Sequence, residues 1–273
     1  MRRRRTGHQI SGSVVLITGA GSGIGRLMAL EATRRGAQRL ILWDRDEATV
    51  AAVAAEIEAL GVEVLVQHVD VTDAAAVVSA ARAAGDVDVV INNAGVVTGL
   101  PLLDATEAGI RRTFEVNTLA LYWVTRAFLP GMIERNHGTI VTVASAAGLV
   151  GVARQTDYSA SKHAAVGFDE SLRAELRAMG SAVSTLVVCP FYISTGMFDG
   201  VQTRIPALLP ILKPDDVATA ILDALEAGRR RLVMPRGVGL LAPARVLPVA
   251  AFDRLLDALG VNRTMDGFTG RVR

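Results

Sequence analysis

The feature that most constrains this chain of 273 residues is a regular alternation of short apolar runs with helix-length segments. The apolar runs are typical of strands and lie at residues 13–19, 39–44, 62–70, 87–92, 138–145 and 182–190. The segments between them are typical of helices and cover residues 25–35, 47–60, 73–84, 108–135 and 157–179. Strands joined by helix-length connections pair in parallel, and strands that are apolar on both faces are buried between helices. The sequence therefore predicts an α/β fold, a doubly wound parallel sheet in a single domain.

The alternation stops after residue 190, where several prolines interrupt the chain before an amphipathic helix that ends near residue 227. Irregular segments after the carboxyl ends of parallel strands are where ligands bind in such folds. We therefore expect a main domain at residues 12–235, whose loop at residues 190–213 contacts a substrate. We expect a flexible basic tail before it at residues 1–11, and a C-terminal helical extension that covers the substrate after it at residues 236–273.

Composition and charge argue against several classes of protein. Half of the residues are hydrophobic, and the net charge of +2 is too small to predict a nucleic-acid partner. The arginines at residues 2–5, 271 and 273 indicate solvated tails, and no apolar run follows the first group. We therefore expect no signal peptide or N-terminal anchor, and at most peripheral contact with a membrane. The single cysteine, Cys189, fits a cytoplasmic location, and the four scattered histidines predict no metal site.

A glycine-rich stretch, TGAGSGIG at residues 18–25, joins the first predicted strand to the first predicted helix. Glycines at this point let the backbone approach a pyrophosphate, which the helix N-terminus stabilises. Asp44 ends the second strand, where a carboxylate can accept hydrogen bonds from both ribose hydroxyls and repel a 2′-phosphate. Ser22 gives the loop no basic side chain for that phosphate, whereas Arg45 would suit it. The pattern favours NAD, with NADP left open by Arg45.

Two further strand ends carry candidate cofactor contacts. Asp70 ends the third strand and is predicted to bond near the adenine, Val71 is predicted to contact the cofactor, and Thr72 or Asp73 is predicted to cap the next helix. Residues 92–95, NNAG, end the fourth strand. Their small side chains allow a flat ring to pack closely, and their asparagines can hydrogen-bond to a neighbouring strand end.

The chemistry is predicted from Tyr158 and Lys162, which lie on one face of a helix at i and i+4, with Ser145 at the end of the preceding strand. A free tyrosine titrates near pH 10, so acid–base work at neutral pH requires about 4 kcal/mol in favour of the phenolate. A cation about 4 Å away supplies energy of that order at an effective dielectric constant of about 20. We therefore expect Lys162 to lower the pKa of Tyr158.

Taken together, these motifs resemble the short-chain dehydrogenase/reductase family in its single-domain Rossmann branch, over about residues 12 to 235. The matching motifs are Thr18-Gly19-x-x-x-Gly23-Ile24-Gly25, Asn92-Asn93-Ala94-Gly95, Asn117, Ser145 and Tyr158-x-x-x-Lys162. The resemblance implies that Tyr158 is the general acid and base and that Ser145 holds the substrate oxygen. It also implies that Lys162 binds the nicotinamide ribose and that Asn117 holds a water that relays protons to Lys162.

The segment CPFYISTGMF at residues 189–198 resembles the family's nicotinamide cover, although Phe191 stands where many members have glycine. The resemblance places Ile193 at the carboxamide and Thr195 near the phosphates. The complete set predicted to bind NAD is Gly19, Ser22, Gly23, Ile24, Gly25, Asp44, Arg45, Asp70, Val71, Asn93, Ala94, Gly95, Tyr158, Lys162, Pro190, Ile193 and Thr195.

A narrower resemblance, in LILWDRD, CPFYISTGMF and NRTMDGFTGR, is to the lipid-acting retinol dehydrogenase and 17-beta-hydroxysteroid dehydrogenase subgroup. Apolar side chains after residue 190 also suit a hydrophobic substrate: Phe191, Tyr192, Met197, Phe198, Ile205, Leu208, Leu209 and Ile211. We expect an NAD(H)-dependent enzyme that interconverts an apolar secondary or allylic alcohol and its ketone or aldehyde. The alternatives are a catalytically silent NAD(H)-binding redox sensor and a reductase of a polar carbonyl substrate. The resemblance also implies a homodimer or homotetramer.

Overall fold

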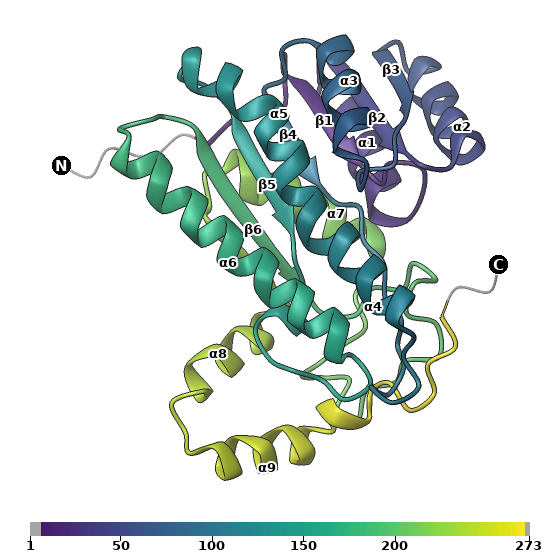
Figure 1. The fold of residues 1–273 in the computed structure, drawn as a ribbon, viewed down its shortest axis with the longest axis vertical. Helices are drawn as coiled ribbons and strands as arrows, with labels where there is room; N and C mark the ends of the chain where they lie inside the picture. Colours follow the sequence, from purple (N-terminus) through teal and green to yellow (C-terminus); the bar gives the residue numbers. More distant parts are fainter. Residues whose placement is uncertain (1–6, 271–273) are drawn as a thin grey trace.

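The computed structural model describes residues 7–270, and the predicted basic residues at 2–5, 271 and 273 lie outside them. Seven parallel strands form one sheet in the order β3-β2-β1-β4-β5-β6-β7 (Figure 1). The order reverses direction at β1, as in doubly wound folds, and places a crevice between the carboxyl ends of β1 and β4. The strands are β1 (Val14–Thr18), β2 (Arg39–Asp44), β3 (Glu63–His68), β4 (Val89–Asn92), β5 (Thr139–Val143), β6 (Ser184–Pro190) and β7 (Arg231–Met234).

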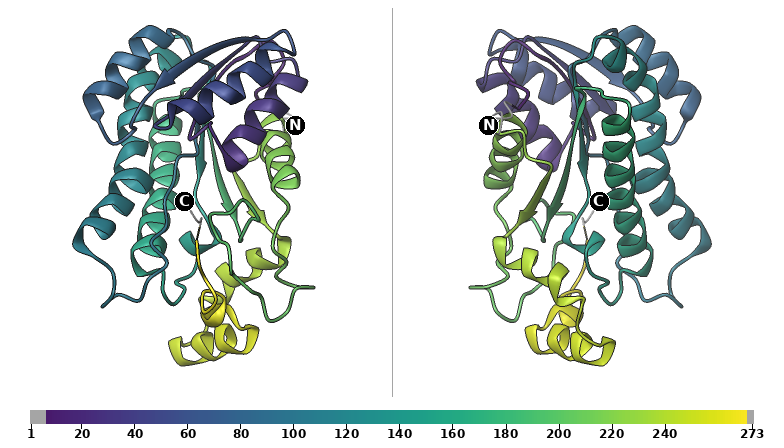
Figure 2. Two further views of the ribbon diagram at one scale, coloured as in Figure 1. Left: turned by 90° about the vertical axis from the view of Figure 1, so that its right-hand side faces the viewer. Right: turned by 90° about the vertical axis from the view of Figure 1, so that its left-hand side faces the viewer.

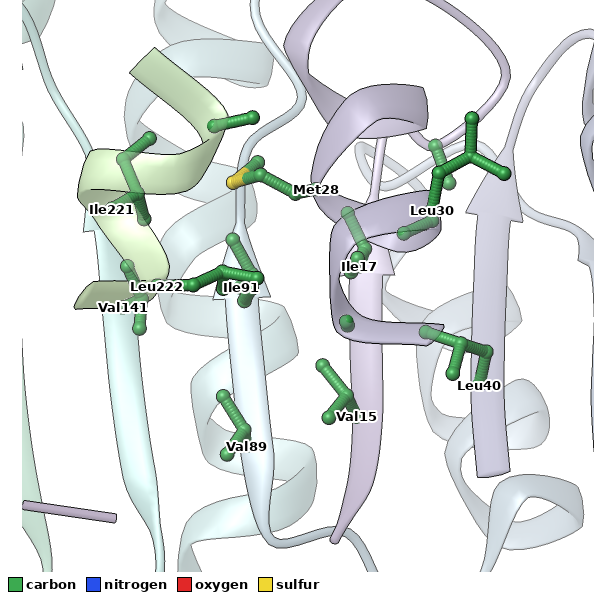
Figure 3. Close-up of a cluster of buried hydrophobic side chains, with 14 of the residues drawn as sticks. Val15, Ile17, Met28, Leu30, Leu40, Val89, Ile91, Val141, Ile221 and Leu222 are labelled. Atoms are coloured by element: carbon green, nitrogen blue, oxygen red, sulfur yellow. The ribbon is translucent and has the colours of Figure 1, made fainter. Parts of the chain in front are cut away.

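Helices cover both faces of this sheet, which confirms the predicted fold. The main helices are α1 (Gly23–Arg34), α2 (Glu47–Glu58), α3 (Ala74–Ala84), α4 (Glu107–Phe114), α5 (Ala120–Glu134), α6 (Thr156–Ala178) and α7 (Pro214–Glu226). Buried side chains of α1, α2 and α7 pack on one face of the sheet, and those of α3, α5 and α6 pack on the other. Figure 3 shows the first of these clusters, in which Met28 and Ile221 lie over Ile17 and Ile91.

The predicted strands and helices agree with the structure within a few residues, and two features were not predicted. A π-helical turn at Glu115–Leu119 joins α4 to α5 inside the predicted long helix. The short strand β7 pairs with β6 at the edge of the sheet. Its apolar run has only three residues between arginines and Pro235, so it gives no clear strand pattern.

The C-terminal part of the chain forms the short helix α8 (Leu241–Ala244) and the helix α9 (Val249–Leu259). Figure 2 shows this extension, in yellow-green, below the carboxyl ends of the strands. Its buried residues Leu241, Leu256 and Val261 share a core with Val150 and Tyr192. The extension therefore closes the end of the sheet at which ligands bind in such folds. Within residues 7–270, no helix is both long and apolar enough to cross a bilayer.

Candidate active site

The glycine-rich loop runs from Thr18 at the end of β1 into the first turn of α1. Gly23 has φ +55°, a conformation that favours glycine. A Cβ at Gly25 would lie 2.1 Å from the Gly19 carbonyl oxygen and 2.7 Å from Asn93 Nδ2. The loop is therefore closed to any larger residue at position 25, and its backbone faces the cavity described below as a phosphate-binding loop requires.

The two strand ends beside this loop are hydrogen-bonded to each other, as expected from the asparagines. Asn93 Nδ2 donates to the carbonyl oxygens of Thr18 and Gly19, at 2.9 and 3.2 Å. Thr18 Oγ1 accepts from the amides of Asn93 and Ala94, both at 3.0 Å. These bonds join β1 to β4 at the point where the strand order reverses, and so fix the floor of the crevice.

Asp44 lies at the end of β2 with its carboxylate turned toward the glycine-rich loop. Its Oδ2 accepts from the Gly21 amide at 2.8 Å, and its Oδ1 accepts from the Asp46 amide at 3.1 Å. Each oxygen keeps a further lone pair, and Asp44 lines the cavity. The neighbouring Arg45 is exposed and also lines the cavity. Both features on which the choice between NAD and NADP rests therefore lie at one end of the cavity.

Asp70, predicted to lie near the adenine, takes part in an ion pair that the sequence did not reveal. Its Oδ1 accepts from the Thr72 hydroxyl at 2.7 Å, and its Oδ2 accepts from Arg112 Nη2 at 3.1 Å. Burial opposes ionisation, but the hydrogen bonds from Thr72 and Arg112 outweigh it and hold the pKa of Asp70 below its usual value. Asp73 caps α3 by accepting from the amides of Ala75 and Ala76.

Tyr158, Lys162 and Ser145 lie together at the other end of the cavity. Tyr158 and Lys162 are buried side chains of α6, and Ser145 follows β5. The Ser145 hydroxyl lies near the Tyr158 side chain. Lys162 Nζ lies 5.7 Å from the centre of the Tyr158 ring and donates to the Val143 carbonyl oxygen at 2.9 Å. The predicted helical spacing therefore places both groups in one pocket, with the ammonium against the carboxyl end of β5.

The pKa of Tyr158 differs from the sequence-based expectation. Burial raises this pKa well above its usual value, and the nearby Ser145 hydroxyl opposes the rise only in part. Burial also lowers the pKa of Lys162 to about 8. The expected lowering of the Tyr158 pKa by Lys162 is therefore wrong for the protein alone. It neglected desolvation, which acts on the phenolate and the ammonium alike.

Asn117 lies in the π-helical turn, and its side-chain amide is already hydrogen-bonded. Its Oδ1 accepts from the Val96 amide at 2.9 Å, while its Nδ2 donates to the Val96 carbonyl oxygen and to Ser161 Oγ. Its side chain thus fixes the loop after Gly95. A Cβ at Gly95 would lie 3.4 Å from Asn117 Oδ1 and 3.6 Å from Lys162 Nζ, so this loop passes directly over the lysine.

One cavity of about 980 Å³ connects the two ends of the site. It is lined by every predicted site residue except Gly25 and Asn117, which lie just behind its wall. Thr195 lies over the glycine loop, since a Cβ at Gly23 would be 3.6 Å from Thr195 Cβ. The amide of Phe191 donates to the Met234 carbonyl oxygen at 2.8 Å, and Phe191 has no positive φ, so the backbone does not require glycine at the position where many family members have it.

The substrate end of the cavity is largely apolar. Of the eight predicted cover residues, Phe191, Tyr192, Met197 and Phe198 line it, whereas Leu208 and Ile211 are each 42% exposed outside it. Arg112, which the sequence did not predict either, lines the cofactor end beside Asp70. At the substrate end, further unpredicted residues complete the lining: Val150, Val152, Gln155, Leu241, Val261 and Phe268 are among them. Several of these come from the C-terminal extension, which carries no recognisable motif. In the described part of the chain, no group of three or more His, Cys, Asp or Glu side chains could hold a metal ion.

A cavity that runs from a glycine-rich helix N-terminus to a buried tyrosine and lysine defines a Rossmann-fold oxidoreductase. The family model for short chain dehydrogenase matches residues 13–205, and the chain belongs to this family, which uses NAD or NADP. Mouse epidermal retinol dehydrogenase 2 is 42% identical over 97% of this chain and 87% of its own length. Rat estradiol 17-beta-dehydrogenase 11 is 39% identical over 96% of this chain and 88% of its own length.

The solved structures agree with this assignment. A short chain dehydrogenase/reductase from Burkholderia phymatum, crystallised in complex with NAD, superposes with a TM-score of 0.80. It is 30% identical in sequence, and the match covers 88% of this chain and 94% of that chain. The predicted family and its retinol and hydroxysteroid dehydrogenase subgroup are thus confirmed.

Proposed function

We propose that this protein is an NAD(H)-dependent oxidoreductase that interconverts an apolar secondary or allylic alcohol and its ketone or aldehyde. The observation that carries the proposal is the position of Tyr158, which lies beside Ser145 at the junction of the polar and apolar ends of one cavity. The retinol and estradiol dehydrogenases to which the chain is similar support an apolar substrate.

The residues of the polar end fit a nicotinamide dinucleotide. Gly25 leaves no room for a side chain beneath the glycine-rich loop, Asp44 can accept from ribose hydroxyls, and Thr195 lies above Gly23. When bound, such a cofactor would accept or supply a hydride. Asp44 favours NAD because its carboxylate would repel a 2′-phosphate, although the exposed Arg45 gives that phosphate a nearby cation.

The remaining chemistry falls to side chains of this chain. The Ser145 hydroxyl would hold the substrate oxygen, and the Tyr158 phenol would take a proton from an alcohol or give one to a carbonyl. Lys162 is largely protonated at neutral pH, and with the cofactor bound its charge would oppose the cost of burying the phenolate. The apolar walls exclude water, which strengthens the attraction between these charges.

The test is turnover of a panel of secondary and allylic alcohols, from cyclohexanol to sterols and retinol, followed by NADH absorbance. Tyr158→Phe removes the acid–base group and should lower kcat by about 10²- to 10⁴-fold. The matched control is Tyr122→Phe, because Tyr122 is 42% exposed and packs on Phe168. This control should keep its activity.

Turnover of a bulky apolar alcohol that survives only in the control would support the proposal. Full activity of Tyr158→Phe would refute the role of the phenol. Silence of the whole panel with tight NADH binding would instead favour the redox sensor, and turnover of polar carbonyls alone would favour the polar reductase.

The assembly of the protein stays a prediction. Leu119 and Tyr122 are each more than 40% exposed where α5 begins, which supports pairing of this helix with a second copy. Light scattering of the purified protein would distinguish a homodimer or homotetramer from a monomer.

Peripheral contact with a membrane also stays a proposal, as does a cytoplasmic location. Leu240, Val246 and Val249 are 70%, 88% and 76% exposed around α8 and α9, beside the exposed Arg245. Apolar side chains next to a cation suit an anionic bilayer surface. Flotation with phosphatidylserine vesicles should be weakened by a Val246→Asp, Val249→Asp variant, and unchanged flotation would count against this surface.

A further inference from the structure

A buried polar cluster lies in the otherwise apolar end of the cavity. Gln155, only 1% exposed, precedes α6 and lines the cavity, as does Tyr192. The Tyr192 hydroxyl lies 2.9 Å from Thr264 Oγ1, and the Gln155 side chain is near enough to Tyr192 to oppose the rise that burial causes in the pKa of this tyrosine. Gln155 Nε2 also lies 3.1 Å from the Met265 sulfur. The roles assigned to the catalytic residues above leave this cluster unused.

The hydrogen bonds of the cluster have a fixed direction. Thr264 Oγ1 donates its only proton to the Val261 carbonyl oxygen at 2.8 Å, so it can only accept from Tyr192. The Tyr192 oxygen, having donated its own proton, presents only lone pairs to the nearby Gln155 side chain. The Met265 sulfur is likewise an acceptor, so both contacts require the nitrogen of the amide. The chain of bonds therefore determines which end of the Gln155 amide is oxygen.

Among residues 7–270, the side-chain oxygen of Gln155 is therefore a hydrogen-bond acceptor without a donor. Gln155 Oε1 is buried and has no hydrogen-bond partner in the described part of the chain. Buried polar atoms in proteins are almost always paired, because an unpaired one loses its hydration without compensation. The last torsion of a glutamine side chain is broad, so a small rotation can turn this oxygen toward a ligand in the cavity.

Gln155 also lies close to the reacting groups. It is the residue immediately before α6 and precedes Tyr158 by three residues in the sequence. Both residues line the cavity, and Phe198 packs against both tyrosines, with ring centres 5.8 Å from Tyr158 and 5.1 Å from Tyr192.

We propose that Gln155 Oε1 is a substrate-binding acceptor that selects apolar alcohols carrying a second hydrogen-bond donor, such as a hydroxyl, a few carbons from the reacting carbon. This specificity rests on the proposed function, because Tyr158 marks the reacting carbon. A hydroxyl satisfies the orphan oxygen by donating to it. A methyl ether at the same place has only acceptor lone pairs and cannot.

The experiment measures binding without turnover, in the full chain saturated with NADH, by calorimetry. The probes are 2-decanol, the decanediols with the second hydroxyl at carbon 4, 5 or 6, and the corresponding methyl ethers at that second position. At least one diol should bind about 5- to 50-fold more tightly than 2-decanol, the range expected when a buried orphan acceptor gains a donor. Its methyl ether should bind no better than 2-decanol.

Two variants test whether Gln155 is responsible. Gln155→Met keeps the length of the side chain and removes the acceptor, so the ratio of diol to 2-decanol affinity should fall close to one. Tyr192→Phe removes a partner that orients the amide, so the amide can turn and the distinction between the diol and its ether should narrow. The second variant keeps the test decisive where the first fails to fold.

Equal affinity for all diols and 2-decanol in the unaltered protein would overturn the inference, as would a diol preference that survives in Gln155→Met. Because the readout is binding, a diol preference without turnover of any alcohol would refute the proposed function but would still show that Gln155 binds the second hydroxyl.

Discussion

Replacing the buried Lys162 with methionine should abolish activity and make the protein more stable at neutral pH. Lys162 is 4% exposed, and burial lowers its pKa from 10.5 to about 8. A lysine with such a pKa is charged in both states at neutral pH, so folding bears the full cost of burying the ammonium. At 1.36 kcal/mol for each tenfold change in the equilibrium constant, that cost is about 3 kcal/mol.

The methionine variant recovers this cost but loses one hydrogen bond. The Val143 carbonyl oxygen, which accepts from Lys162 Nζ, is then left unpaired at a cost of about 1–2 kcal/mol. The net gain is about 1–2 kcal/mol, which corresponds to a rise in Tm of about 2–8 °C for a domain of this size.

The sign of the pH dependence gives a second check. Folding lowers the pKa of Lys162, so this lysine destabilises the folded protein. The destabilisation is largest below about pH 8, where Lys162 is protonated in both the folded and the unfolded protein. Between about 8 and 10.5 the folded protein has lost this proton while the unfolded chain keeps it, so the unaltered protein gains stability as the pH rises. The advantage of Lys162→Met should therefore shrink through this range.

The assay is thermal unfolding followed by circular dichroism at several pH values, without cofactor. The matched control is Lys213→Met, at the exposed Lys213 before α7, which should leave Tm unchanged at every pH. A Lys162→Met protein that is less stable than the parent at neutral pH, with a difference that does not vary with pH, would refute the reasoning.

Three further predictions concern the cofactor and the acid–base group. Asp44→Ala removes the carboxylate held by the Gly21 amide. The variant should lower the ratio of kcat/KM with NAD to kcat/KM with NADP by about 10- to 100-fold. An unchanged ratio would show that Asp44 does not select NAD over NADP. Gly25→Ala places a Cβ against the Gly19 carbonyl oxygen and should weaken NADH binding by about 10-fold or more in a fluorescence titration, whereas Gly167→Ala, with open space around it, should not. Because burial raises the pKa of Tyr158, the rate of alcohol oxidation should climb with pH from neutral into the alkaline range, and a maximum in acid would contradict a phenolate base.

The parts of the fold that follow from local pattern could be predicted from the sequence. Strands buried on both faces give continuous apolar runs such as residues 39–44, and β2 has those bounds. Strand β7 was missed because its pairing with β6, rather than its own short sequence, makes it a strand.

In the candidate site, too, local sequence patterns predicted some residues, whereas tertiary packing determines others. Tyr158 and Lys162 could be placed together because helical spacing fixes their relation, and Asp44 because strand ends converge at one edge of a parallel sheet. The ion pair between Asp70 and Arg112 joins residues 42 positions apart in the sequence, so no local sequence pattern predicts it. The raised pKa of Tyr158 was missed because desolvation depends on the whole pocket, which includes residues from the C-terminal extension.

The C-terminal extension contributes to substrate binding but not to cofactor binding. The cofactor end is built from strand ends and a helix N-terminus, so the positions of Asp44 and Gly25 follow from the parallel sheet itself. The substrate end is closed by Leu241, Val261 and Phe268, which approach through tertiary packing alone. Substitutions in the extension should therefore change which alcohol binds while leaving NADH affinity nearly constant. The Gln155 cluster lies wholly at the substrate end, where it connects the residue before α6, through Tyr192, with Thr264 in the C-terminal segment.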